Sequence, residues 1–181
     1  MTEKLVEDFK EKGTITFKTG GTVSDGRLVE KTFENMLTEA NDIAVELGIG
    51  SGLNFISTTT AEHLFGFTFH YMLPYVTGNI TQPERIHYPE NINFDNAVLV
   101  TTPSFLEAMR KYDSHPVKNP KIIISAGAKL ETPSFEFAQT IADEVIEIYG
   151  STESGVIAYR KNPNENLKLF RGIKILETGN D

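Results

Sequence analysis

A short polar segment follows an apolar run near residue 150: Tyr149, Gly150, Ser151, Thr152 and Glu153 come directly after residues 145–148. A tyrosine ring can stack on a nucleotide base, and a threonine hydroxyl can donate to a phosphate oxygen. A carboxylate beside a phosphate suits Mg²⁺, because this ion takes few protein ligands and shares the phosphate oxygens. The segment therefore indicates a nucleotide site, and its alternative interpretation is a hydroxyl-rich turn between two strands.

A second segment with the composition of a ligand loop covers residues 19–27 and begins with Thr19, Gly20, Gly21 and Thr22. Glycines let the backbone wrap closely around an anion, and hydroxyl groups donate to its oxygens. The segment matches neither the Gly-Lys-Ser/Thr end of a Walker loop nor the GxGxxG pattern. It predicts a phosphate-binding loop, with a plain glycine turn between strand and helix as the alternative.

A third segment, residues 125–129, places Ser125, Ala126, Gly127 and Ala128 after an apolar strand. The lack of a bulky side chain would let a flat ring lie against the backbone. The alternative is a tight connection from strand to helix.

Histidine chemistry receives little support. The four histidines at positions 63, 70, 87 and 115 form neither HxxxH nor HExxH spacing, which argues against a zinc site. No GxSxG elbow is present, so a serine hydrolase is not indicated. His63 and His70 share a helical face and are expected to pack in the core, as are the aromatic residues at 65, 67, 69 and 71, which also offer an apolar wall.

The elements that must position these segments alternate between strand and helix. The best helix pattern covers residues 32–47, with Thr32 and Gly48 as caps, and Thr102-Pro103 begins another helix that runs to about residue 112. Further helices are predicted at 61–73, ended by Pro74, and at 133–143. Strands are predicted at 14–19, 53–57, 97–101, 121–125 and 145–149, and residues 74–89 are interpreted as loop-rich.

This alternation predicts an α/β fold with a mainly parallel sheet and helices on both faces. In such sheets, ligands bind beyond the carboxyl ends of the strands. The strand ends near residues 19, 57, 125 and 149 carry small or hydroxylated residues, so we expect several of them to converge on one crevice.

Composition limits the function classes. A length of 181 residues predicts one domain over residues 1–181. A net charge of −8 argues against nucleic-acid binding, and the absence of cysteine excludes disulfides and thiolate chemistry. The charged N-terminus is no signal peptide and no apolar run reaches membrane-spanning length, so we expect a cytoplasmic protein without a membrane partner.

The three segments, with one more, resemble a known family. Residues 149–153 resemble the YGxTE signature of the adenylate-forming enzymes, which include acyl-CoA and aryl-CoA synthetases. Residues 19–22 resemble the family's TSGTTG phosphate loop, residues 63–66 its HxxG helix, and residues 125–130 its SGAAPL-type adenine loop. The four motifs occur in the family's order, and the similarity spans roughly residues 14–175, which is the central part of such an enzyme.

The resemblance implies a subdomain of the family's large domain and a role for each matching residue. Tyr149 would stack on adenine, with Gly127 and Ala128 on the other side of that pocket and Gly150 and Ser151 alongside. Thr152 would bind the α-phosphate, Glu153 would hold Mg²⁺, and His63 would border the carboxylate substrate. Residues 19–22 would close over the outer phosphates.

The implied reaction is that of a ligase. A carboxylic acid attacks the α-phosphorus of ATP to give an acyl-adenylate and pyrophosphate, and the acyl group then passes to a thiol such as that of CoA.

Several departures from the family pattern limit this expectation. The loop at 19–27 lacks the family's Pro and Lys and contains Asp25, whose charge opposes polyphosphate. The equivalents of the ribose-binding aspartate, the hinge and the lid lysine would lie beyond residue 181, and the N-terminal part of the large domain has no counterpart. We therefore expect the isolated chain to be inactive, to self-associate through exposed apolar surface, and to need a complementary chain.

Two alternatives remain open. The chain could be a non-catalytic remnant that binds a nucleotide or an acyl compound as an interaction module. It could also be an α/β module for another phosphorylated ligand, although that explains the glycine segments without explaining the order of the four motifs.

Overall fold

The computed structural model describes residues 2–19 and 26–176. Its elements are, in chain order, α1 (Thr2–Lys12), β1 (Thr14–Lys18), β2 (Leu28–Thr32), α2 (Phe33–Leu47), β3 (Asn54–Ser57), α3 (Leu64–Phe67), the π-helix η1 (Thr68–Met72), α4 (Leu73–Thr77), β4 (Ile80–Arg85), the 3₁₀-helix η2 (Pro89–Asn91), β5 (Ala97–Thr101), α5 (Pro103–Lys111), β6 (Ile122–Ser125), α6 (Thr132–Ile141), β7 (Glu144–Ser151), β8 (Gly155–Arg160) and β9 (Lys168–Leu169).

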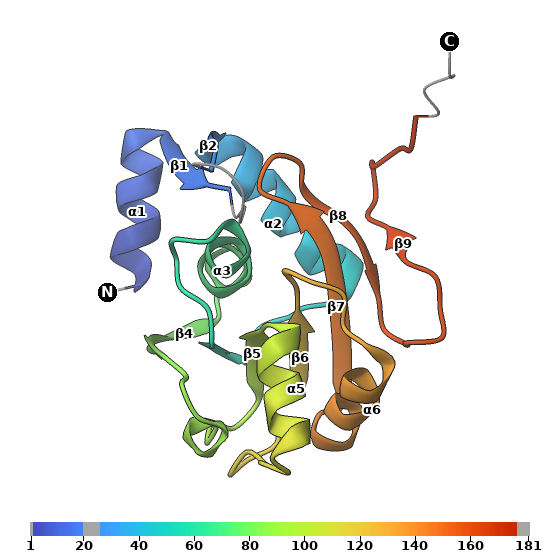
Figure 1. The fold of residues 1–181 in the computed structure, drawn as a ribbon. Coiled ribbons are helices and arrows are strands. Elements are labelled where there is room, and N and C mark those ends of the chain that lie inside the picture. The colour runs from blue at the N-terminus through green and yellow to red at the C-terminus, as the bar shows by residue number, and fades with distance from the viewer. Residues whose placement is uncertain (1, 20–25, 177–181) are drawn as a thin grey trace.

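A seven-stranded sheet forms the centre of the fold, in the order β4-β3-β5-β6-β7-β8-β9 (Figure 1). β4, β3, β5, β6 and β7 run parallel, and β8 and β9 add antiparallel strands at one edge. Every residue of β5 and β6 is buried, as is typical of parallel strands that are covered on both faces. The predicted α/β fold with a mainly parallel sheet is therefore confirmed.

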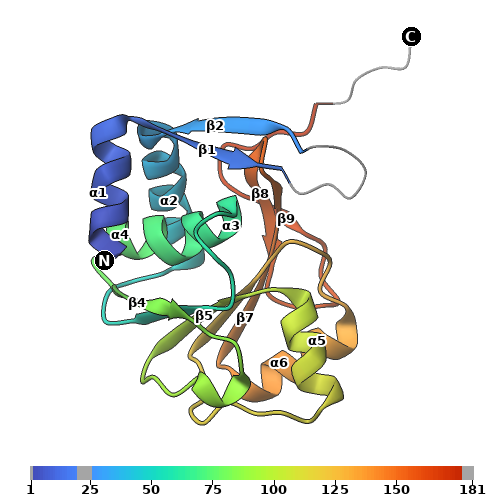
Figure 2. The same ribbon diagram turned by 60° about the vertical axis from the view of Figure 1, so that its left-hand side comes forward.

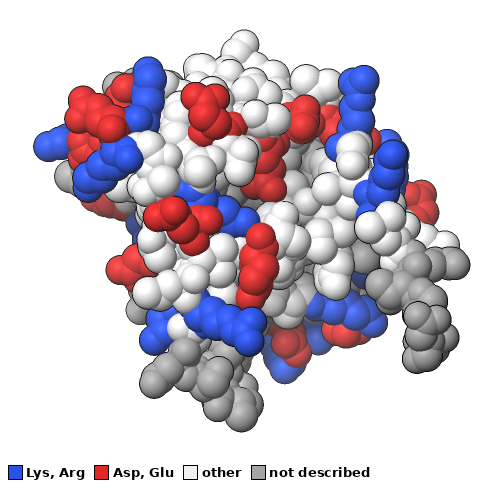
Figure 3. Space-filling view, turned by 90° about the horizontal axis from the view of Figure 1, so that it is seen from above, with Lys and Arg blue, Asp and Glu red and all other residues white. Residues whose placement is uncertain are grey.

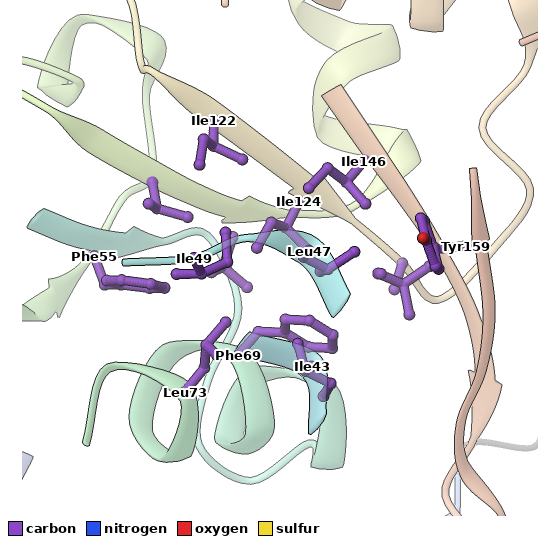
Figure 4. Close-up of a cluster of buried hydrophobic side chains, with 14 of the residues drawn as sticks. Ile43, Leu47, Ile49, Phe55, Phe69, Leu73, Ile122, Ile124, Ile146 and Tyr159 are labelled. Atoms are coloured by element: carbon purple, nitrogen blue, oxygen red, sulfur yellow. The ribbon is translucent and has the colours of Figure 1, made fainter. Parts of the chain in front are cut away.

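Helices cover both faces of this sheet, as Figure 2 shows. On one face, side chains of α2 and of the helical segment 64–77 pack on the sheet; Figure 4 shows Ile43, Phe69 and Leu73 against strand residues such as Phe55 and Ile124. On the other face, α5 and α6 bury Leu106, Met109, Phe135 and Ile141 against β5, β6 and β7.

α2 follows the sequence prediction closely. Thr32 caps its N-terminus, where the hydroxyl accepts a hydrogen bond from the N–H of Asn35, and Gly48 ends it in the left-handed conformation. The helix buries Met36, Ala40 and Ile43 along one stripe.

The N-terminal segment differs from the prediction. β1 and β2 form a separate antiparallel sheet, so the strand that precedes Thr19 is not part of the central sheet. The preceding helix α1 was not predicted, because its sequence is largely charged and, among residues 4–12, only Val6 and Phe9 are buried. These two residues pack with Phe17, Phe33 and Phe67 in a third cluster that attaches the hairpin to the body.

Two further predictions were wrong. Pro74 does not end the helical segment: the preceding η1 has the wider π-helical turn, in which Leu73 N–H bonds to the carbonyl of Thr68, and the helix continues to residue 77. The loop-rich stretch contains β4, an edge strand that Pro83 and the polar residues around it concealed.

Candidate functional site

A cavity of about 510 Å³ opens at the carboxyl ends of the parallel strands. The segments that follow β3, β5 and β6 contribute Thr59, Thr102 and Gly127 to its wall, and the end of β7 contributes Gly150 and Ser151. The strand ends thus converge on one cavity, as expected from their parallel arrangement. Thr19 reaches the same cavity from the separate β1–β2 sheet.

Most of the predicted site residues that the structure describes border this cavity. They are Thr19, His63, Gly127, Gly150, Ser151, Thr152 and Glu153. Ala128 and Tyr149 are exposed beside it without lining it, and Tyr149 retains 56% of its accessible surface. Gly20, Gly21 and Thr22, as well as Asp25, lie outside the described residues. The roles assigned to all these residues stay predictions.

The polar segment at 149–155 forms the hairpin between β7 and β8, and also lines the cavity. A bulge at Tyr149 and Gly150 shifts the register of the two strands. The Oγ atoms of Ser151 and Ser154 lie 2.9 Å apart, and Ser151 Oγ accepts the N–H of Ser154 at 3.2 Å. The hydroxyl-rich turn that was the alternative interpretation is therefore present, and it places Thr152 and Glu153 at the cavity.

Two side chains from the N-terminal third of the chain, Lys31 and Glu39, form hydrogen bonds with the backbone of this hairpin. Lys31 Nζ donates to the carbonyl of Glu153 at 2.8 Å. Glu39 Oε1 accepts the N–H of Val156 at 2.8 Å, and Gly155 leaves room for that carboxylate because it has no Cβ. These bonds connect β2 and α2 to the turn that carries Thr152 and Glu153.

Glu39 was not predicted as a site residue, although it lines the cavity. Burial raises the pKa of its carboxyl group, and the N–H of Val156 and the charge of Lys31 partly offset that effect. A signal was available, because position 39 lies three residues after Met36 and four before Ile43, within the buried stripe of α2.

A buried ion pair supports the loop at 126–130. Glu147 accepts from Arg160 Nε at 2.6 Å and from the N–H of Leu130 at 2.8 Å. Arg160 also donates to the carbonyl of Leu130, at 3.4 Å. Both ionic side chains are largely withdrawn from solvent, so the pair fixes the segment that carries Gly127 against β7 and β8.

Besides Lys18, much of the remaining cavity wall is apolar. Leu64, Phe65, Phe69, Ile148 and Val156 contribute to it. Of the four aromatic residues expected to pack in the core, Phe67 and Tyr71 pack in the third cluster, and Phe69 and Phe65 pack in the cluster on the sheet. Phe65 and Phe69 also border the cavity. Thr68 lines it too, and its hydroxyl has no hydrogen-bond partner among the residues that the structure describes.

The expectation that His63 and His70 share a helical face and pack in the core is wrong for His63, which precedes the helix and is exposed. His63 is exposed at the cavity, at the residue before α3, whereas His70 is buried and its Nε2 lies 3.3 Å from the carbonyl of Phe55. Within residues 2–19 and 26–176, no cluster of three or more His, Asp or Glu side chains could hold a metal ion.

The wider surface and the helices add two observations. Viewed onto the upper side of the molecule, acidic and basic side chains are interspersed around uncharged surface (Figure 3). None of the described helices has the length and apolar character needed to cross a membrane.

Comparison with known proteins gives one curated relative and many similar folds. A 4-coumarate--CoA ligase of Halorhodospira halophila is 28% identical over 174 residues, which cover 94% of this chain and 43% of that protein. An acyl-CoA synthetase (AMP-forming)/AMP-acid ligase II-like protein of Dyadobacter fermentans has a TM-score of 0.73 at 15% identity, over 94% of this chain and 52% of that one. ATP-bound MatB of Rhodopseudomonas palustris has a TM-score of 0.68 at 15% identity, over 83% of this chain and 31% of that one.

No family model matches the chain. The chain spans less than half of the length of the curated relative. Sequence and fold nevertheless agree with the resemblance carried by the four motifs, and the solved neighbours include malonyl-CoA ligase. The chain is thus similar in sequence to a CoA ligase, and in fold to an acyl-CoA synthetase-like protein and MatB, over part of their length.

Proposed function

We propose that the cavity binds an adenosine nucleotide and a carboxylic acid, and that it forms the nucleotide-binding core of an acyl- or aryl-acid ligase. One observation carries the proposal: all four motifs contribute described residues to a single cavity. The neighbours support it, because MatB is described with ATP, and malonyl-CoA ligase with AMP and methylmalonyl-CoA.

In this proposal the loop at 126–128 and Tyr149 hold the adenine, and Thr152 donates to the α-phosphate. His63 borders the carboxylate of the acid. Thr19, whose hydroxyl accepts the N–H of Arg27 at 2.9 Å, lies at the base of the loop expected to cover the outer phosphates. The protein's contribution to catalysis is mainly positioning, with hydrogen bonds that offset phosphate charge.

Glu153 is the residue that would hold Mg²⁺. Its side chain lies at the cavity, and a single carboxylate is a sufficient protein ligand when phosphate oxygens complete the shell. When bound, the ion would neutralise part of the triphosphate charge. Lys31 holds the backbone carbonyl of this residue and so fixes the position from which the carboxylate extends.

The proposed reaction is attack of a carboxylate oxygen on the α-phosphorus of ATP. The bond to the bridging oxygen breaks, pyrophosphate leaves, and an acyl-adenylate forms, which then passes its acyl group to a thiol such as that of CoA. For residues 1–181 assayed alone we propose nucleotide binding without turnover, with a complementary chain supplying the remaining parts of the family's enzyme.

Calorimetric titration with AMP and with Mg-ATP tests the nucleotide site. We expect Thr152→Ala and Glu153→Gln to weaken Mg-ATP binding about tenfold, the usual effect of losing a hydrogen bond or ligand to a charged group. Glu136→Gln, on the far side of the sheet in α6, is the charge-matched control and should bind as the unaltered chain does. Absence of nucleotide binding, or equal binding by all three variants, would refute the proposal.

Pyrophosphate exchange separates a ligase core from a non-catalytic remnant. We expect no carboxylate-dependent exchange of labelled pyrophosphate into ATP by the 181 residues alone. Exchange above the background of Glu153→Gln would show that they form an adenylate, and would eliminate the remnant alternative.

A further inference from the structure

One carboxylate of the cavity lies beside apolar residues of β8. Glu39 lines the same cavity as Phe65, Phe69, Ile148 and Val156, and it contacts Val156 directly. Its Oε1 accepts one backbone hydrogen bond, from Val156. Its Oε2 has no hydrogen-bond partner among the residues described, although a carboxylate can accept several bonds.

Among the described residues, no basic side chain forms an ion pair with this carboxylate. Across the described part of the chain, no Lys, Arg or His nitrogen lies within 4.0 Å of a Glu39 oxygen. Lys31 exerts some attraction, but its Nζ is already bonded to the carbonyl of Glu153. A partly desolvated carboxylate without a counterion is unfavourable, so a cation brought by a ligand would stabilise it.

We propose that Glu39 is a specificity-determining residue, and that it selects carboxylic acids that also carry a protonated amine. This inference rests on the proposed function, because it names the class of acid taken by that cavity. The amine would donate to Glu39, while the acid's own carboxylate is repelled by Glu39 and directed toward the nucleotide. Glu39 would thereby select the acid and orient it.

Two other features of the cavity fit such a substrate. Phe65 and Phe69 lie with ring centroids 5.1 Å apart and offer an apolar surface for a spacer between amine and carboxylate. Thr68 also lines the cavity, and its buried hydroxyl has no hydrogen-bond partner among the described residues. The substrate class is therefore an amino acid whose amine and carboxylate are separated by an apolar or aromatic spacer.

A purely structural role for Glu39 makes a different prediction. If its only task is to hold Val156, then Glu39→Gln should leave ligand preference unchanged, because the amide oxygen can still accept that N–H. The specificity role requires the negative charge, so Glu39→Gln removes the preference for the amine while keeping the hairpin bond.

Calorimetry with two nearly isosteric acids tests the inference. In 4-(aminomethyl)benzoate a protonated amine replaces the terminal methyl group of 4-ethylbenzoate. We expect the unaltered chain to bind the amino acid about tenfold more tightly, and Glu39→Gln to lose that preference while binding 4-ethylbenzoate within about twofold of the original. Asp42→Asn, on the exposed side of the same helix, is the control and should keep the preference. Urea midpoints check that both variants fold.

Equal affinity for the two acids, a preference that survives in Glu39→Gln, or no binding of either acid overturns the inference. Titrating the acids with and without AMP separates this outcome from failure of the proposed function. AMP binding without the preference leaves the function standing and removes the role of Glu39. A preference for the amino acid without AMP binding keeps the role of Glu39 and removes the proposed nucleotide site.

Discussion

The free energy of unfolding should decrease as the pH is lowered, because of His70. Burial lowers the pKa of this histidine from 6.5 to about 4, and outweighs the carbonyls of Phe55 and Gln82, which favour the charged ring. The folded state therefore holds His70 neutral, whereas the unfolded chain takes up a proton near pH 6.5. The stabilisation is fully present above that pH and is lost as the pH falls toward 4.

The size of the effect follows from the two pKa values. Between pH 7.5 and 5, the unfolded state gains about 2 kcal/mol relative to the folded state through His70 alone, and the loss approaches about 3 kcal/mol near pH 4. Carboxylates add their own pH dependence, so the His70 contribution has to be isolated by comparison with a variant that lacks it.

His70→Gln is that variant. Its amide nitrogen can replace Nε2 as the donor to the Phe55 carbonyl, but it does not titrate. We expect urea unfolding to show a free energy of unfolding that falls by about 2 kcal/mol more in the unaltered chain than in His70→Gln between pH 7.5 and 5. Parallel pH profiles of the two proteins would refute the assignment of a neutral, buried His70.

Three further predictions concern the hairpin, the buried ion pair and the surface. In urea unfolding, Gly155→Ala should destabilise the chain by more than Gly48→Ala. Both glycines have positive φ (76° and 70°), but of the two only Gly155 would place a Cβ against Glu39. Equal losses of stability would contradict this. Arg160→Met leaves Glu147 buried without a counterion and should cost about 3 kcal/mol, most of it recovered when Glu147→Leu is added; an additive double variant would contradict it. Exposed Ile175, Leu176 and Val45 should promote self-association, and a strictly monomeric species in light scattering at micromolar concentration would rule it out.

The elements predicted best are those whose local hydrophobic pattern matches their burial in the fold. α2 has a helical stripe and both caps, and β5 and β6 are short apolar runs that could hardly be anything but buried. The convergence of strand ends followed from parallel topology alone. Residues of the motifs at 125–130 and 149–153 border the cavity because they follow strands of the parallel sheet, and their roles stay predictions.

Prediction from the sequence failed where the arrangement depends on distant partners. The residues of β1 have strand propensity, but that propensity does not say which sheet they join, and in the structure they pair with β2. Pro74 is tolerated because η1 widens the turn ahead of it, which no local rule anticipates. Glu39 resembles any other acidic residue of α2 until β8 places Val156 against it.

The two bonds that hold the hairpin also bear on the order in which the molecule is assembled. Lys31 and Glu153 are 122 residues apart, and Glu39 and Val156 are 117 apart. Contacts that close such long loops form late in folding, because the chain entropy they cost is recovered only once the intervening sheet exists. During synthesis, the parallel strands up to β6 can therefore associate before the β7–β8 hairpin completes the cavity. Ligand binding should be the last property the chain acquires as it folds, and the first it loses when β8 separates from α2.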